Sequence, residues 1–263
     1  MLIKQLKYDL KFGNKVLIIF YILAFFFAIL TRIFLSIDNS FIMNIIGKVC
    51  GGVSISMIFN ILINNVMRLW VRFKHNLYGD ESYLTHTLPI EKKTLYLSKI
   101  LTSIITLFVS MIIIALTLFI AYYSKENLEF IKNMLLPLAE LYESSILMLL
   151  IEFLFIFFLE IANIVQAGFT GIILGHNMNN AKTGYSVLYG FGVYMGTQIF
   201  AVLALFLVGL FNNEIMNTFI TNTLVSVDTI KLIVLIATIT YTLSLIILYI
   251  VNIRLFKKGV NVD

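Results

Sequence analysis

The chain has 263 residues, of which 60% are hydrophobic and 13% are charged, and its mean hydropathy is +0.97. This composition excludes an ordinary soluble protein and indicates an all-helical integral membrane protein. No stretch is long and polar enough to form a second, soluble domain, so residues 1–263 are expected to form a single transmembrane domain. The net charge of +5 is not a nucleic-acid signal, because the basic residues lie between apolar runs.

Residues 2–15 have two faces. The apolar face carries Leu2, Ile3, Leu6 and Leu10, and the basic face carries Lys4, Lys7, Lys11 and Lys15. This pattern predicts an amphipathic helix in the membrane interface, although the lysines could instead be a positive flank to the first span. The apolar run that follows is too long for a signal peptide, and no small-x-small cleavage site comes after it.

Six segments have the roughly 20 apolar residues that a membrane-spanning helix needs. They are residues 16–36, 42–66, 100–123, 144–170, 185–211 and 230–253. If the amino terminus is cytoplasmic, fourteen of the 19 Lys and Arg residues fall on the inner side. We therefore expect a multi-pass protein of the cell membrane with both termini in the cytoplasm. The outer connections, 124–143 and 212–229, are short, and Pro137 is expected to interrupt any helix in the first.

The longest charged segment, residues 67–99, joins the second and third spans and is expected to be cytoplasmic. Gly79 and Asp80 form a turn signal, whereas Pro89 and Glu91 suit the first turn of a helix. The segment should therefore be helix, turn, and a helix continuous with the third span. Its aromatic and apolar side chains are interleaved with charge, which indicates packing on another surface or an aromatic belt at the headgroups.

Polar residues form stripes inside the spans. At 100° per residue, one face of the fourth span carries Glu152, Glu160, Asn163 and Gln166. Acids at membrane depth usually face a bundle interior, a cavity or a partner, so the stripe is either a structural contact or a substrate path. In the third span, Thr102, Thr106, Ser110 and Thr117 are expected to serve helix packing.

Two Gly-x-x-x-Gly pairs permit close helix approach, Gly171 with Gly175 and Gly192 with Gly196. Either pair could serve a contact within the chain or a dimer seam.

Several kinds of chemistry have no motif in the sequence. There is no P-loop, no His-Glu-x-x-His and no Gly-x-Ser-x-Gly, so we expect neither catalytic residues nor a nucleotide site in this chain. Its three histidines, His75, His86 and His176, are scattered over two loops, and its one cysteine is Cys50. No metal site or cofactor is therefore expected here.

Residues 77–99 read LYGDESYLTHTLPIEKKTLYLSK. With six spans, an amphipathic amino-terminal helix and a large first cytoplasmic loop, this segment resembles the permease subunit of ABC type 2 transporters of Gram-positive bacteria. In that family a similar acidic "Asp-Glu-Gly-Tyr-Leu-Thr" precedes "Thr-Leu-Pro" and a basic stretch. Ser82 here stands where glycine is expected.

The resemblance implies a coupling loop that docks on a separate ATPase subunit, which would bind ATP and Mg²⁺. The implied contact residues are Tyr78, Asp80, Glu81, Tyr83 and Thr87, with a smaller second contact in the turn from His176 to Lys182. It also implies residues 2–12 as an interfacial connecting helix, and a second permease copy or paralogue. The implied cargo is an amphiphile such as a peptide, lantibiotic, lipid or drug.

Two other classes remain open. A carrier or channel without an ATPase would need intramembrane charge pairs or broken helices, and the sequence shows neither clearly. A non-transporting scaffold or sensor subunit would need only the same docking loop.

Overall fold

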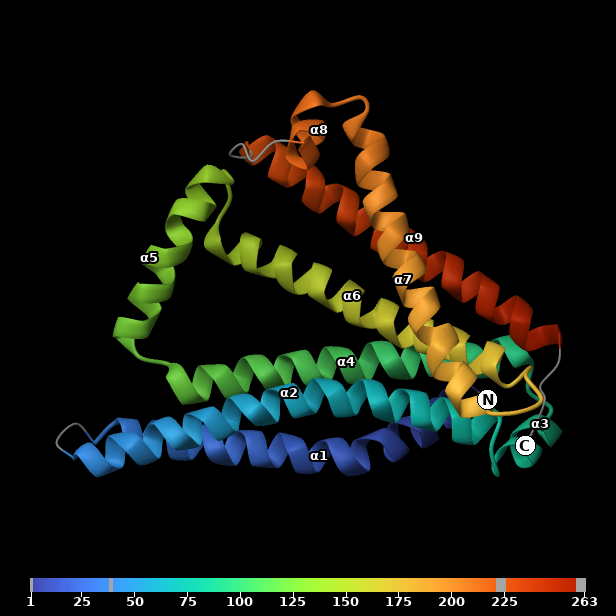
Figure 1. The fold of residues 1–263 in the computed structure, drawn as a ribbon. Helices are drawn as coiled ribbons and strands as arrows, with labels where there is room; N and C mark the ends of the chain where they lie inside the picture. Colours follow the sequence, from blue (N-terminus) through green and yellow to red (C-terminus); the bar gives the residue numbers. More distant parts are fainter. Residues whose placement is uncertain (1, 38–39, 221–225, 259–263) are drawn as a thin grey trace. The chain divides into compact units, whose positions relative to one another are not determined.

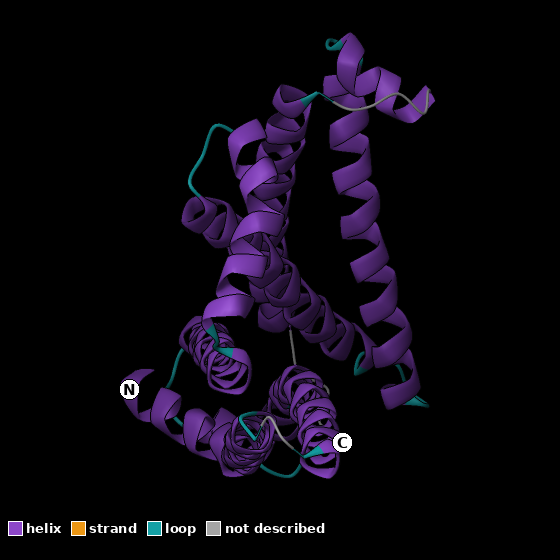
Figure 2. Ribbon diagram, turned by 90° about the vertical axis from the view of Figure 1, so that its left-hand side faces the viewer, coloured by secondary structure: helices purple, strands orange, loops and turns teal. Residues whose placement is uncertain are grey.

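The computed structural model describes residues 2–37, 40–220 and 226–258, and every regular element in those ranges is a helix (Figures 1 and 2). The six that are long and apolar enough to cross a membrane are α1 (Leu2–Leu35), α2 (Phe41–Leu77), α4 (Lys92–Tyr122), α6 (Ile146–Gly175), α7 (Lys182–Gly209) and α9 (Val227–Lys258). The prediction of an all-helical protein with six helices able to span a membrane is thus confirmed for the described residues. A helix satisfies its own backbone hydrogen bonds, which lipid cannot do.

The spans are longer than their apolar cores. At 1.5 Å per residue, the 28 to 37 residues of these helices measure roughly 42–55 Å, against about 30 Å of hydrocarbon. Helix α2 continues well past the expected boundary at residue 66 and ends at Leu77. The segment 67–99 is therefore mostly helical, with only the short α3 (Ser82–Thr87) and its flanking turns between α2 and α4.

Residues 2–15 are helical, but they form one continuous helix with the first span. In Figure 2, where α1, α2 and α4 are viewed nearly end-on, the amino-terminal turns of α1 run across the view at a steep angle to the rest of the helix. The lysine-rich stretch and the span are thus distinct in direction although no break separates them.

The described residues divide into two compact units, which we describe separately. The first unit contains the chain up to Asn76 together with His86–Ile131, and the second contains Leu77–Thr85 and the chain from Lys132 onward. Residues Leu77–Thr85, the middle of the 67–99 segment, therefore belong to the second unit, whereas α2 and α4, which the segment joins, belong mainly to the first.

In the first unit, α1, α2 and α4 lie side by side (Figure 1). Leu17, Tyr21 and Ala24 of α1 and Ile61 of α2 are buried in its apolar core. The buried Ser110 hydroxyl of α4 links all three helices, because Tyr21 Oη lies 2.8 Å away and Asn65 Nδ2 donates to it over 2.7 Å. The other hydroxyls of that stripe are buried and donate to backbone carbonyls of α4.

In the second unit, α6 packs against both α7 and α9. A Cβ atom added at Gly171 would lie less than 3.0 Å from backbone atoms of Gly190 and Ser186, and one at Gly175 would meet Ser186 equally closely. The first Gly-x-x-x-Gly pair therefore serves a contact within the chain. At Gly192 and Gly196, an added Cβ would meet no described atom within 4 Å.

The two connections that are expected to lie outside both contain a helix, α5 (Lys125–Leu141) and α8 (Asn213–Ile220). The expectation that Pro137 interrupts the first is wrong, because α5 continues through it to Leu141. Helix α8 is tied to the start of α9, since the Glu214 carboxylate accepts hydrogen bonds from the hydroxyls of Thr229 (2.6 Å) and Ser226 (2.7 Å). These bonds lower the pKa of Glu214. Residues 221–225 of this connection and the termini, 1 and 259–263, lie outside the described residues.

Candidate functional site

The turn after α2 exposes a mixture of acidic and apolar side chains. Ser82 N donates to Gly79 O over 2.8 Å and closes the turn. The large side chains of Tyr83 and Leu84, both in the short helix α3, are 65% and 75% exposed. The exposed side chains of this surface, which we call the loop surface, are those of Asp80, Glu81, Tyr83, Leu84 and Thr87.

Tyr78, which the resemblance implies as a partner contact, lies beneath this surface. Its side chain is 1% exposed, and its ring packs against the ring of His176 at 4.6 Å and that of Phe256 at 6.5 Å. Burial raises the pKa of the Tyr78 phenol. Tyr78 therefore joins the loop to the ends of α6 and α9 within the second unit, and it offers little surface to a partner.

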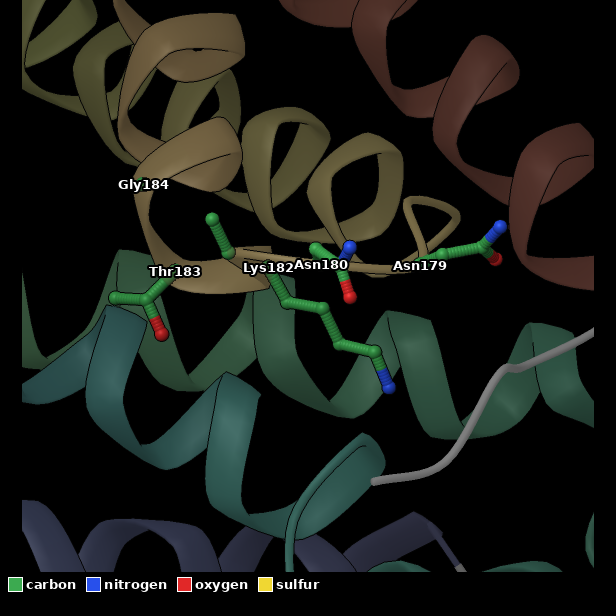
Figure 3. Close-up of a pocket in the computed structure, with 6 residues that line it drawn as sticks. Asn179, Asn180, Lys182, Thr183 and Gly184 are labelled. Atoms are coloured by element: carbon green, nitrogen blue, oxygen red, sulfur yellow. The ribbon is translucent and has the colours of Figure 1, made fainter.

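His176 is likewise buried, and its Nδ1 is 2.8 Å from Ile172 O. The accessible part of the α6–α7 turn is the stretch after it, which forms an open pocket (Figure 3). The lining residues are Asn179, Asn180, Ala181, Lys182, Thr183 and Gly184. Ala181 adopts a left-handed conformation with φ of 50°, which turns the chain sharply into α7. Lys182 therefore belongs to an accessible surface, whereas His176 is buried at the end of α6.

The first unit contains an ion cluster that the sequence analysis did not identify. Asp9 of α1 is 1% exposed, and its carboxylate accepts hydrogen bonds from Lys99 Nζ (2.7 and 2.8 Å), Arg72 Nε (2.9 Å) and Ser98 Oγ (3.1 Å). Lys99 Nζ also donates to Asn76 Oδ1 over 2.6 Å. One carboxylate thus ties the amino-terminal turns of α1 to α2 and α4, close to where the chain leaves and re-enters the first unit.

The position of Asp9 on the amino-terminal helix could have predicted this cluster from the sequence. At 100° per residue, Asp9 lies about 20° from Leu2 and about 160° from Lys11. An acid on the apolar face of an amphipathic helix, facing away from the lysines, indicates a buried partner of opposite charge.

The predicted polar stripe of α6 divides in the structure. Glu152 is exposed near the start of α6. Burial raises the pKa of the nearby Tyr142 phenol, and the negative charge of Glu152 raises it further. Asn163 and Gln166 are buried. Glu160 alone is bonded across helices: its Oε1 accepts hydrogen bonds from Tyr194 Oη (2.7 Å) and Gln198 Nε2 (3.0 Å) of α7.

This network extends to a third helix, since Tyr241 Oη of α9 donates to Gln198 Oε1 over 3.1 Å. The four side chains, Glu160, Tyr194, Gln198 and Tyr241, form what we call the mid-helix network. The sequence analysis did not identify its α7 and α9 members. Gln198, an amide in the middle of an apolar span, was the available signal.

Comparison of the chain with protein-family models, with curated proteins and with solved structures finds no match. Among the described residues, no three His, Cys, Asp or Glu side chains gather as metal ligands would. The loop surface, the Asp9 cluster and the mid-helix network are therefore the features from which function has to be inferred.

Proposed function

We propose that the chain is the membrane-spanning permease subunit of an ATP-driven exporter of the ABC type 2 class. The observation that carries this proposal is the loop surface, an exposed group of two acids and large apolar side chains between two long spans. Aromatic and apolar groups beside charge are typical of a protein interface. Because the sequence has no P-loop, a separate ATPase subunit with ATP and Mg²⁺ supplies the energy.

The ATPase subunit docks on the loop surface, and the pocket at residues 179–184 is its second, smaller contact. Asp80, Glu81, Tyr83, Leu84 and the pocket are accessible surfaces of the second unit, whereas Thr87 belongs to the first unit. Tyr78 and His176, which pack together below them, are supports for this surface rather than contacts.

Two sets of contacts support a role for the loop in transmitting movement. Through Tyr78, the loop packs on the ends of α6 and α9. Through the chain itself, it continues into α2 and α4, whose ends are tied to α1 by Asp9. When ATP binding draws the ATPase subunits together, displacement of the loop is transmitted to helices of both units, because packed helices move as rigid elements.

The orientation follows from the distribution of basic residues, with the loop and both termini in the cytoplasm of the cell and α5 and α8 outside. The low charge of the spans suits an amphiphilic cargo such as a peptide, lantibiotic, lipid or drug. An ATPase-independent carrier or a scaffold subunit is the competing class.

Reversal of both acids of the loop surface tests the docking proposal. In Asp80→Lys/Glu81→Lys, we expect the amount of co-purifying ATPase to fall by more than about tenfold, because like charges then face the partner across the interface. Membrane insertion and yield should be unchanged, since both side chains are exposed. The measurement is affinity purification from gently solubilised native membranes, with identification of the bound chains.

The matched control is Glu126→Lys/Glu129→Lys, which reverses two exposed acids of α5. We expect it to retain the ATPase at the wild-type level. A chain that purifies alone in several mild detergents, or a loop variant that keeps its ATPase, would contradict the transporter proposal and favour the carrier or scaffold class.

A second permease copy completes the proposed transporter, and the face of α7 around Gly192 and Gly196 is available for it. We expect Gly192→Leu/Gly196→Leu to reduce the dimer fraction measured by light scattering, because two added side chains would separate the backbones of the two copies. Val202→Leu, at another exposed position of α7, serves as the control. An unchanged dimer fraction would exclude this face as the seam.

A further inference from the structure

The carboxylate of Glu160 is only half satisfied. Oε1 accepts two hydrogen bonds, from Tyr194 and Gln198. Oε2 is buried, and no described residue forms a hydrogen bond with it. The Tyr241 hydroxyl lies beside the same carboxylate, but it donates to Gln198 Oε1. A buried carboxylate oxygen without a donor is costly, and native structures keep such a group where a water, an ion or a ligand completes it.

Two further polar side chains of α6 are also incomplete. Asn163 is 0% exposed, and neither of its amide atoms has a partner among the described residues; the same is true of Gln166 Oε1. These residues follow Glu160 at intervals of three, so each lies about one turn from the next on neighbouring faces of the helix. Unused acceptors therefore recur along this stretch of α6.

The second unit offers no counter-charge at this depth. Helix α6 has no basic residue, and those of α7 and α9 stand near the helix ends. They are Lys182, Lys231, Arg254, Lys257 and Lys258. Glu160, by contrast, is the fifteenth of the 30 residues of α6, and Tyr194, Gln198 and Tyr241 are also central in their helices.

The group that completes such a site must donate hydrogen bonds and carry positive charge. A divalent metal ion prefers six or more oxygen ligands or near-ideal octahedral geometry, which one free carboxylate oxygen does not supply. An ammonium or guanidinium group provides several N–H donors and the missing charge. Tyrosine rings beside the carboxylate also favour a cation.

We propose that Glu160 binds the ammonium or guanidinium group of a cationic amphiphile, with Asn163, about 60° away on the same helix, as a further acceptor. The inference rests on the proposed function, since it names the class of molecule that the permease moves. The ligand is an amphiphile rather than a free ion, because the site lies in the middle of three apolar helices where an alkyl chain is also accommodated.

Membrane lipids with a primary amine carry the same chemistry, but their headgroups lie about 15 Å from the bilayer centre. The middle of a 30-residue helix is about 22 Å from either end and so corresponds to mid-depth. A lipid headgroup would reach Glu160 only by leaving the surface, whereas a free amphiphile can enter with its charged group first.

The test is binding of labelled dodecylammonium to the purified full-length chain in phosphatidylcholine nanodiscs. We expect saturable binding by the wild type and affinity more than about tenfold lower in Glu160→Gln, because a charge-assisted hydrogen bond and its charge are lost. Dodecyltrimethylammonium, which has the charge but no N–H donor, should also bind more than about tenfold more weakly. Glu152→Gln, eight residues earlier on the same helix, should lie within about twofold of the wild type, since that acid is exposed.

Wild-type affinity in Glu160→Gln would overturn the proposal. Equal binding of the two probes by the wild type would do so as well, and that comparison needs no variant that folds. Nanodiscs of phosphatidylethanolamine identify the source of the amine: unchanged probe affinity supports a free amphiphile, and strong competition would assign the site to lipid and overturn the cargo reading. No ATPase is present in this assay, so loss of probe binding leaves the docking proposal standing. Loss of docking would remove the role of the amphiphile as transported cargo, but not its binding at Glu160.

Discussion

Replacement of Asp9 by Asn is expected to lower the free energy of unfolding by about 3–5 kcal/mol, the usual cost of removing one partner from a buried ion pair. Asn has nearly the shape of Asp, so the packing is kept while the charge is lost. Lys99 and Arg72 then remain at 3% and 11% side-chain exposure without their carboxylate. The measurement is reversible unfolding of the purified chain in mixed micelles.

Two further variants separate loss of the charge from loss of the fold. Lys11→Gln changes an exposed charge of the same helix and should shift stability by less than about 0.5 kcal/mol. Asp9→Asn/Lys99→Met removes the carboxylate and the more deeply buried of its two cations, leaving Arg72, and should recover part of the lost stability. If Asp9→Asn unfolds like the Lys11→Gln control, the cluster does not hold α1 in place.

Addition of a methyl group at Gly171 is the second large effect that we expect. The Cβ of Gly171→Ala would meet backbone atoms of α7, which cannot rotate away as a side chain can. The two helices must separate, and the free energy of unfolding should fall by about 2–3 kcal/mol. The same unfolding assay measures this loss.

Glycine in a helix is otherwise unfavourable relative to alanine, by roughly 0.5–1 kcal/mol, so the direction of the change is diagnostic. At Gly52 and Gly184, an added Cβ would meet no described atom within 4 Å. Gly52→Ala and Gly184→Ala should therefore be neutral or slightly stabilising. A stabilising Gly171→Ala would show that α6 and α7 are not closely packed.

The loop surface lies on a buried aromatic contact between Tyr78, His176 and Phe256. The resemblance implied Tyr78 and His176 as partner contacts, but the two rings pack on each other and are buried. Of the other implied contacts, Asp80, Glu81, Tyr83 and Thr87 are exposed, and Lys182 lines the accessible pocket. The proposed docking area is therefore narrower than the motif, and the buried Tyr78 lies below that area rather than in it.

The sequence by itself determined the class of the protein and the presence of six helices long and apolar enough to cross a membrane, but not where those helices end. Length and hydropathy suffice for this, because a membrane imposes about 20 apolar residues and internal backbone hydrogen bonding on any helix that crosses it. Periodicity also indicated which residues share a helix face, as with Glu160 and Asn163, or with Gly171 and Gly175.

Only the tertiary structure decided what each face meets. The glycine pair could have formed a dimer seam, yet it packs against Ser186 and Gly190 of the same chain. Likewise, α6 meets Tyr194 and Gln198 of α7 at Glu160, and Asp9 meets Lys99, ninety residues away. Helical periodicity depends on neighbours within about four residues, whereas the choice of a partner depends on how whole helices pack, which no local pattern records.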